Sequence, residues 1–173
     1  MAATYNHEDA GVLKRDIRRS AGWKPLSLFY ARTLHLFDRA VFRLSRGRAT
    51  FTSWLAGLPV AWLTTTGAKS GVERTSPVLA IPCGDGRLIV IASNYGQRNN
   101  PAWYHNLRKH PRTRILFDGS EQEMIARELD GDERAQWYER GIEIYPGWVQ
   151  YRQRAPRTIP VIELSAAARA TGS

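Results

Sequence analysis

Residues 60–92 have the sequence VAWLTTTGAKSGVERTSPVLAIPCGDGRLIVIA, in which three apolar or β-branched runs alternate with two short glycine-containing turns. The runs cover residues 60–66, 74–81 and 87–92. Valine, isoleucine, threonine and aromatic residues favour strands, and turns of this length connect antiparallel neighbours. This part of the chain is therefore predicted to be a three-stranded meander.

Three further strands are expected downstream, at residues 113–117, 124–129 and 158–164. The first two flank an Asp-Gly-Ser turn and form a hairpin. The third contains Pro160, whose missing N–H places it at a sheet edge or near a bulge. Short helices are expected at residues 100–110, where Asn100 suits the cap, and at residues 130–144. Six mostly antiparallel strands with two short helices favour a small α+β barrel over a parallel α/β sheet.

The first fifty residues differ from the rest in periodicity and charge. Apolar residues recur at helical spacing from 26 to 44, with basic residues on the opposite face. Residues 1–48 contain ten Lys or Arg against four acidic residues. We expect a basic amphipathic helical segment over residues 1–50, a barrel domain over 51–165 and a tail over 166–173.

Two alternative roles are open for this amphipathic helix. It covers the barrel or a neighbouring subunit, or it lies in a membrane interface without spanning the bilayer. In the second case Arg32, Arg39 and Arg43 would attract anionic lipid.

The composition excludes several classes of protein. A chain of 173 residues that is 43% hydrophobic and 24% charged suits a globular domain, and its one cysteine excludes an internal disulfide. We expect neither a spanning helix nor an export signal, which favours the cytoplasm. The net charge of +9 favours an acidic ligand, an anionic membrane or a nucleic acid as partner. Basic and aromatic residues do not interleave along one strand face, so a nucleic acid is not expected.

The sequence predicts neither a metal site nor a catalytic nucleophile. The four histidines are dispersed, and none has ligand spacing beside Cys83. No Gly-x-Ser-x-Gly elbow is present.

The turn at residues 67–71, Gly-Ala-Lys-Ser-Gly, is the first candidate site. Turn amides can form a concave anion site, to which Lys69 adds a point charge and Arg74 a two-pronged donor. The alternative is a solvated hairpin turn, since the spacing is not that of a P-loop.

Two further clusters contain small, polar and aromatic residues. Residues 92–96 end a strand with small and polar side chains, which lets a planar ring approach the backbone, and Trp103 follows as a ring contact or a core residue. Tyr145, Trp148 and Tyr151 fall on one face at spacing i, i+3, i+6. These three aromatic residues either close a pocket over a flat substrate or pack on the barrel.

Five segments in order resemble the deazaflavin-dependent nitroreductase family of the flavin/deazaflavin oxidoreductases. They are LTTTGAKSG at 63–71, RTSP at 74–77, IASNYG at 91–96, NPAWYHNL at 100–107 and RTIPV at 157–161. The resemblance covers residues 50–164. It implies a split β-barrel of the FMN-binding type that binds the deazaflavin coenzyme F-420. The reduced coenzyme would donate a hydride to quinones, nitro compounds or activated enones, and the protein would orient the reactants.

The resemblance also implies the site residues. Ala68, Lys69, Ser70, Gly71 and Arg74 would hold the phosphate and acidic tail of the coenzyme. The polyol and ring would lie along Thr75, Ser76, Pro77, Val78, Leu79, Ile91, Ala92, Ser93, Asn94, Ala102, Trp103, Tyr104, His105 and Asn106. Ser93 would polarise or protonate the substrate acceptor. Tyr145, Trp148 and Tyr151 would line the substrate side, with Trp148 also near the coenzyme.

Three positions depart from the family pattern. Ala68 stands where arginine is frequent, and Asn94 stands where lysine is frequent, so the coenzyme tail meets less positive charge. Trp148 replaces a common tyrosine and removes a phenol donor.

Other functions and assemblies stay open at this point. An FMN-binding oxidase would share the fold, and a basic lipid- or nucleic-acid-binding barrel is an alternative of another class. Split barrels often pair, so a homodimer is an open expectation. A peripheral contact with the inner face of the cell membrane would follow if the N-terminal helix binds lipid.

Overall fold

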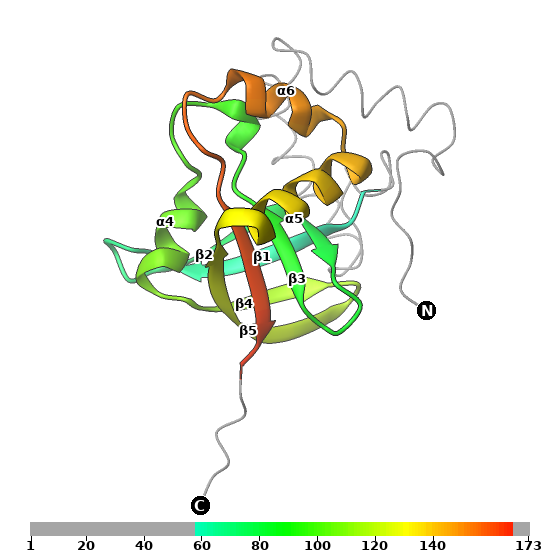
Figure 1. Cartoon of the computed structure of the whole chain (residues 1–173). Helices are drawn as coiled ribbons and strands as arrows, with labels where there is room; N and C mark the ends of the chain where they lie inside the picture. Colours follow the sequence, from blue (N-terminus) through cyan, green and yellow to red (C-terminus); the bar gives the residue numbers. More distant parts are fainter. Residues whose placement is uncertain (1–57, 168–173) are drawn as a thin grey trace, which may run out of the picture.

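The computed structural model describes residues 58–167 (Figure 1). The helix expected over residues 26–44, with Arg32, Arg39 and Arg43, lies outside the described residues, as do residues 168–173 of the expected tail.

Six strands form a closed barrel in the order β1-β2-β3-β6-β5-β4, and every neighbouring pair is antiparallel. The strands are β1 Val60–Thr66, β2 Glu73–Pro82, β3 Leu88–Ile91, β4 Arg112–Phe117, β5 Ser120–Leu129 and β6 Val161–Ala166. This arrangement confirms the predicted small antiparallel barrel, including the meander of β1, β2 and β3.

Helical segments connect β3 to β4 and β5 to β6. They are η1 Asn94–Gly96, α4 Ala102–Lys109, α5 Gly131–Ile144 and α6 Gly147–Arg154. In Figure 1, α4 lies beside the barrel, α5 crosses the outside of the sheet, and α6 lies above them at the top of the view.

Of the two alternatives predicted for Pro160, a sheet edge or a bulge, the sheet edge is wrong. β6 pairs with β3 on one side and with β5 on the other, so it has no free edge. Pro160 lies one residue before β6, where its missing N–H removes no bond from the ladder. Its carbonyl still accepts a hydrogen bond from the Ala92 N–H at 2.9 Å.

Two separate apolar cores result from the alternation of side chains along the strands. The barrel interior holds one set, which includes Leu63, Val90 and Leu164, and Trp103 and Leu107 of α4 join it. The outer core lies between the barrel and helices α5 and α6. The residues that form it are Leu58, Ile81, Ile89, Ile91, Leu129, Tyr138, Ile144, Tyr145, Trp148, Tyr151, Ile159 and Val161.

Helix α5 approaches the barrel closely at Gly141. A Cβ atom at this position would lie 2.6 Å from Ile91 Cδ1 and 2.6 Å from Trp148 Cζ3. No side chain fits there without displacing one of its neighbours, so glycine sets the distance between α5, α6 and β3.

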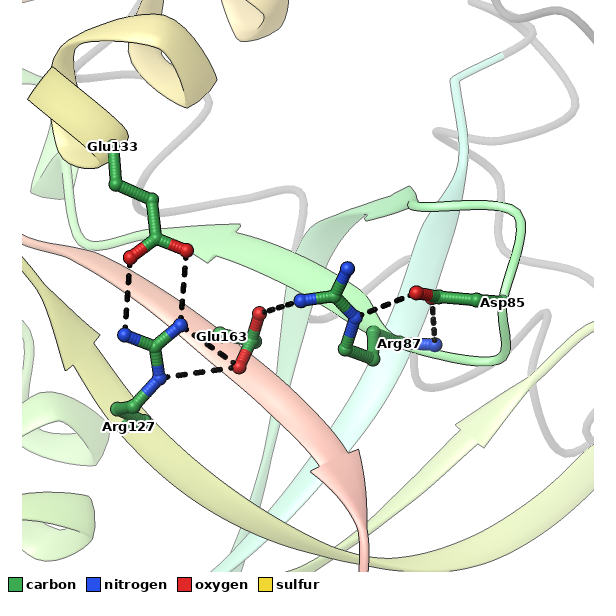
Figure 2. A network of polar contacts seen from close by, with 5 residues as sticks. All are labelled: Asp85, Arg87, Arg127, Glu133 and Glu163. Atoms are coloured by element: carbon green, nitrogen blue, oxygen red, sulfur yellow. Dashed lines mark hydrogen bonds and ion pairs between the residues drawn. The ribbon is translucent and has the colours of Figure 1, made fainter.

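An ion-pair network joins α5 to the strands around Glu163 of β6 (Figure 2). Glu163 is only 5% exposed, and its carboxylate accepts hydrogen bonds from Arg87 at 2.5 Å and from Arg127 at 3.1 Å. Arg127 also binds both carboxylate oxygens of Glu133 in the first turn of α5, at 2.9 and 3.0 Å. Hydrogen bonding to Arg127 lowers the pKa of Glu133, and hydrogen bonding to Arg87 lowers that of Asp85. Two guanidinium groups thus neutralise one buried carboxylate.

We expect Glu163→Gln to destabilise the protein by about 1.5–3 kcal/mol, since the amide leaves two neighbouring guanidinium groups without their shared anion. Urea unfolding measures this change. The matched control is Glu123→Gln, because Glu123 pairs with Arg112 at 3.8 Å on the surface and should contribute less than about 1 kcal/mol. Equal losses in the two variants would contradict the structural role of the network.

Candidate active site

The turn between β1 and β2 is held in shape by its own backbone. The Gly67 N–H donates to the Val72 carbonyl at 2.9 Å, and the Gly71 N–H donates to the Gly67 carbonyl at 2.8 Å. Gly71 has a positive φ of 69°, which other residues rarely adopt. The backbone N–H groups of Lys69 and Ser70 have no acceptor within residues 58–167. Two neighbouring free N–H groups on a rigid turn are suited to binding an anion.

Helix α4 anchors this turn through Asn106, which is 7% exposed. Asn106 Oδ1 accepts a hydrogen bond from the Ala68 N–H at 2.9 Å, and Asn106 Nδ2 donates to Thr65 Oγ1 at 3.0 Å. Lys109 Nζ, from the last turn of α4, donates to the Ala68 carbonyl at 2.6 Å. Asn106 was expected beside the ring of the coenzyme, and Lys109 was not predicted. The sequence marks Lys109 only as a basic residue near the end of the expected helix.

Cationic side chains surround the turn. Lys69 and Arg74 are exposed, and neither forms an ion pair with a carboxylate in the described part of the chain. Together with Lys109 they give the turn positive charge that is not neutralised locally.

The residues expected along the coenzyme on β2 alternate between exposed and buried positions. Thr75 and Pro77 are exposed, Ser76 and Leu79 are half-buried, and Val78 is buried in the barrel core. The Thr75 hydroxyl lies 2.8 Å from that of Thr64 on β1. Val78 can therefore present only its backbone to a ligand outside the barrel.

The segment after β3 adopts an unusual backbone conformation. Asn94 and Tyr95 have positive φ values of 46° and 56°, which cost free energy in residues other than glycine. Asn94 Nδ2 donates to the Asn99 carbonyl at 2.8 Å and closes this loop. At Gly96, a Cβ atom would lie 2.9 Å from the Tyr151 carbonyl oxygen, so glycine allows η1 to contact α6. Ser93 and Asn94 are half-buried, whereas Ile91 and Ala92 are buried.

Arg157 holds this loop by its backbone carbonyl groups. Its Nη2 lies 3.2 Å from the Ala92 carbonyl oxygen, 3.1 Å from that of Ser93 and 3.3 Å from that of Asn99. Its Nε also donates to the Gln97 carbonyl at 3.2 Å. Burial lowers the pKa of Arg157, and its Nη1 is buried without an acceptor among residues 58–167. Arg157 belongs to the RTIPV segment of the family resemblance, but no role was predicted for it from the sequence.

The start of α4 differs from the prediction. The helix begins at Ala102 with Pro101 in the cap position, and no side chain caps it. The predicted Asn100 cap is therefore wrong, and Asn100 Oδ1 is buried without a donor in the described residues. Trp103 and Tyr104 lie in the barrel core, while Ala102 and His105 are exposed. For Trp103 this supports the core alternative.

Tyr145, Trp148 and Tyr151 all lie in the outer core. The Tyr145 and Tyr151 hydroxyls are 2.9 Å apart, and desolvation raises the pKa of Tyr151. This packing agrees with the second of the two alternatives, stacking on the barrel. One polar contact still joins these rings to the other clusters, because Trp148 Nε1 donates to Ser93 Oγ at 3.3 Å.

Hydrogen bonds thus connect all three predicted clusters. Asn106 joins the β1–β2 turn to α4, Arg157 joins Ala92 and Ser93 to the loop before α4, and Trp148 joins Ser93 to α6. Among residues 58–167, no three His, Cys, Asp or Glu side chains are grouped to hold a metal ion. Burial raises the pKa of Cys83 to about 11, which makes its thiol a poor nucleophile at neutral pH.

The sequence profile of the F420H(2)-dependent quinone reductases matches residues 37–165. The chain belongs to this family. The resemblance to an F-420-dependent family is therefore confirmed, and the profile covers both the β1–β2 turn and the Ser93 loop.

Related proteins agree with this assignment. The chain is 32% identical to the F420H(2)-dependent quinone reductase Rv1261c of Mycobacterium tuberculosis (strain ATCC 25618 / H37Rv), over 76% of this chain and 89% of that protein. It is similar to a solved F420-H2 dependent reductase, FDR-A, with 33% identity and a TM-score of 0.57, over 62% of this chain and 94% of that one. A structure described as a domain-swapped dimer has 30% identity and a TM-score of 0.60, over 73% of this chain and 95% of that one.

We expect Asn106→Ala to destabilise the protein by about 1–3 kcal/mol, because the Ala68 N–H and the Thr65 hydroxyl both lose a buried partner. Urea unfolding measures this effect. His105→Ala, at the exposed neighbouring position of α4, is the control and should change stability by less than about 0.5 kcal/mol. An Asn106→Ala protein as stable as the control would show that the amide does not anchor the turn.

Proposed function

We propose that this protein transfers a hydride from reduced coenzyme F-420 to a quinone. The observation that carries this proposal is the β1–β2 turn, which offers two free backbone N–H groups beside Lys69, Arg74 and Lys109. An anionic coenzyme needs such a site, and the family assignment identifies that coenzyme as F-420.

The described residues fit the chemistry of this coenzyme. Lys69, Ser70, Gly71 and Arg74 would bind its phosphate and acidic tail by charge-assisted hydrogen bonds. The ring would lie between the end of β3, near Ser93 and Asn94, and the start of α4. Bound there, the coenzyme supplies the hydride, while the protein binds, orients and shields the reactants.

Ser93 is the group we propose to act on the hydride acceptor. Its side chain is half-buried, and its backbone is fixed by Arg157. A quinone takes up a hydride and a proton, and negative charge develops on its oxygen during this change. A hydroxyl that donates a hydrogen bond to that oxygen stabilises the charge.

Several finer features belong to the same proposal. Nitro compounds and activated enones are further acceptors of a hydride, and the resemblance in the sequence alone supports them. Tyr145, Trp148 and Tyr151 would act on the substrate side from within the outer core, as its wall rather than as a loose lid. The related domain-swapped dimer supports a homodimer as the assembly.

The proposal also includes the location of the enzyme in the cell. Within residues 58–167, no helix is long and apolar enough to cross a membrane. We propose a cytoplasmic enzyme whose basic N-terminal segment contacts anionic lipid, which suits a membrane-dissolved quinone. The relatives give no support to an FMN oxidase or to a nucleic-acid-binding barrel.

The proposal is tested by mixing the purified protein with reduced F-420 and menadione. We expect menadione-dependent oxidation of the coenzyme, followed at the deazaflavin absorbance band. Reduced FMN serves as the control donor and should give no catalysed reaction, and a nitroaromatic acceptor tests the wider substrate range. Failure to oxidise reduced F-420 with any of several quinones would reject the proposed activity.

Combining Lys69→Ala with Arg74→Ala should raise the dissociation constant of F-420 at least about tenfold, because losing even one charge-assisted contact costs about 1.5–3 kcal/mol. Fluorescence titration of the coenzyme measures this constant. Arg112→Ala combined with Arg140→Ala removes the same charge from surface ion pairs elsewhere and is the matched control. A similar weakening in both double variants would indicate a general charge effect rather than a built anion site.

A further inference from the structure

The indole of Trp148 has one polar group, and its position determines how Ser93 can form hydrogen bonds. Trp148 Nε1 lies 3.3 Å from Ser93 Oγ. An indole N–H can donate a hydrogen bond but cannot accept one. Ser93 Oγ is therefore the acceptor in this contact, and the proton of its own hydroxyl must point elsewhere.

The Trp148 ring is held rigidly in the outer core. It is 2% exposed, and the missing side chain of Gly141 leaves the space that its six-membered ring fills. Tyr145 packs against it edge-on, with ring centroids 5.7 Å apart and planes at 89°. The Trp148 carbonyl also accepts a hydrogen bond from the Tyr138 hydroxyl at 2.9 Å. The direction of the indole N–H is thus set by packing and does not adapt to Ser93.

The backbone of Ser93 is fixed just as firmly. Its N–H donates to the Ile91 carbonyl at 2.9 Å, and its carbonyl accepts from the Gly96 N–H at 2.9 Å and from Arg157 at 3.1 Å. The side chain is half-buried, and its hydroxyl proton has no acceptor in the described part of the chain. The remaining freedom of the hydroxyl is rotation about its own bonds, which the Trp148 N–H restricts.

We propose that Trp148 is a positioning residue, which fixes the Ser93 hydroxyl as a hydrogen-bond donor to the carbonyl oxygen of the hydride acceptor. A tyrosine hydroxyl at this position could donate or accept a hydrogen bond, and would leave the Ser93 hydroxyl free to be either the donor or the acceptor. The indole N–H of tryptophan can only donate, so the Ser93 hydroxyl proton stays available for another partner. The inference rests on the proposed function, since it names the hydroxyl that donates a hydrogen bond to the hydride acceptor.

Trp148→Phe tests the proposal, because it keeps a flat ring and removes the N–H. With reduced F-420 and menadione we expect kcat to fall about fivefold or more, while the dissociation constant of the coenzyme changes less than about twofold. Ser93→Ala should lower kcat at least as much, and the double variant should be no slower than Ser93→Ala alone. Trp137→Phe, a half-buried tryptophan of α5, is the matched control and should retain full activity.

A second readout needs neither the coenzyme nor activity. The indole N–H resonance of Trp148, assigned by its loss in Trp148→Phe, should shift in Ser93→Ala and exchange faster with solvent, while that of Trp137 stays unchanged. An unmoved Trp148 resonance, or additive losses of kcat in the double variant, would overturn the inference. If the wild-type protein reduces no quinone, the proposed function is rejected, and so is the proposed action of Ser93 on the hydride acceptor. The Trp148 resonance still tests whether Trp148 donates a hydrogen bond to Ser93.

Discussion

One buried side-chain amide, that of Asn106, determines where the β1–β2 turn lies relative to helix α4. Its oxygen accepts the Ala68 N–H and its nitrogen donates to the Thr65 hydroxyl, so both ends of the amide are satisfied within the barrel hairpin. The Ala68 N–H is thereby turned toward α4, and the next two N–H groups of the turn stay free. Without this amide the turn would keep its own backbone hydrogen bonds but lose its buried anchor on α4, and fixing its position on binding would reduce the affinity for an anion.

Much of the barrel could be predicted from the sequence, because its signals are local. Turn glycines and β-branched runs mark β1 to β3, and the Asp-Gly-Ser turn marks the β4–β5 hairpin. Pro160 led to a wrong prediction of an edge strand, because β6 pairs on both sides with strands β3 and β5, which lie far away in the chain. The predicted Asn100 cap is wrong because α4 begins at Ala102 with Pro101 in the cap position, so Asn100 lies one residue too early to cap it.

The candidate site was predictable by residue type and not by role. Lys69 and Ser70 are exposed on a rigid turn and Arg74 is exposed at the start of β2, as an anion site requires. Asn106, Lys109 and Arg157 act instead through bonds to the backbone of segments about 40 to 65 residues away in the chain. No periodicity or spacing encodes such contacts. The same holds for Trp148, whose position on one face with Tyr145 and Tyr151 was visible, whereas its contact with Ser93 depends on how α6 packs against η1.

Several arginines of the described region pair with carboxylates, whereas Arg157 binds carbonyl oxygens, and the two arrangements have opposite consequences for charge. Arg87 and Arg127 share the buried Glu163 (Figure 2). Arg114, Arg140 and Arg152 pair with carboxylates near the surface, so the charge of all five arginines is neutralised by partners within the fold. Arg157 instead binds carbonyl oxygens through Nε and Nη2, and because a carbonyl group carries no charge, the charge of Arg157 is left beside Ser93. A carboxylate in that place would repel an anionic ligand and would compete for the same donors. Carbonyl partners therefore allow one arginine to fix the loop and still keep the site electropositive.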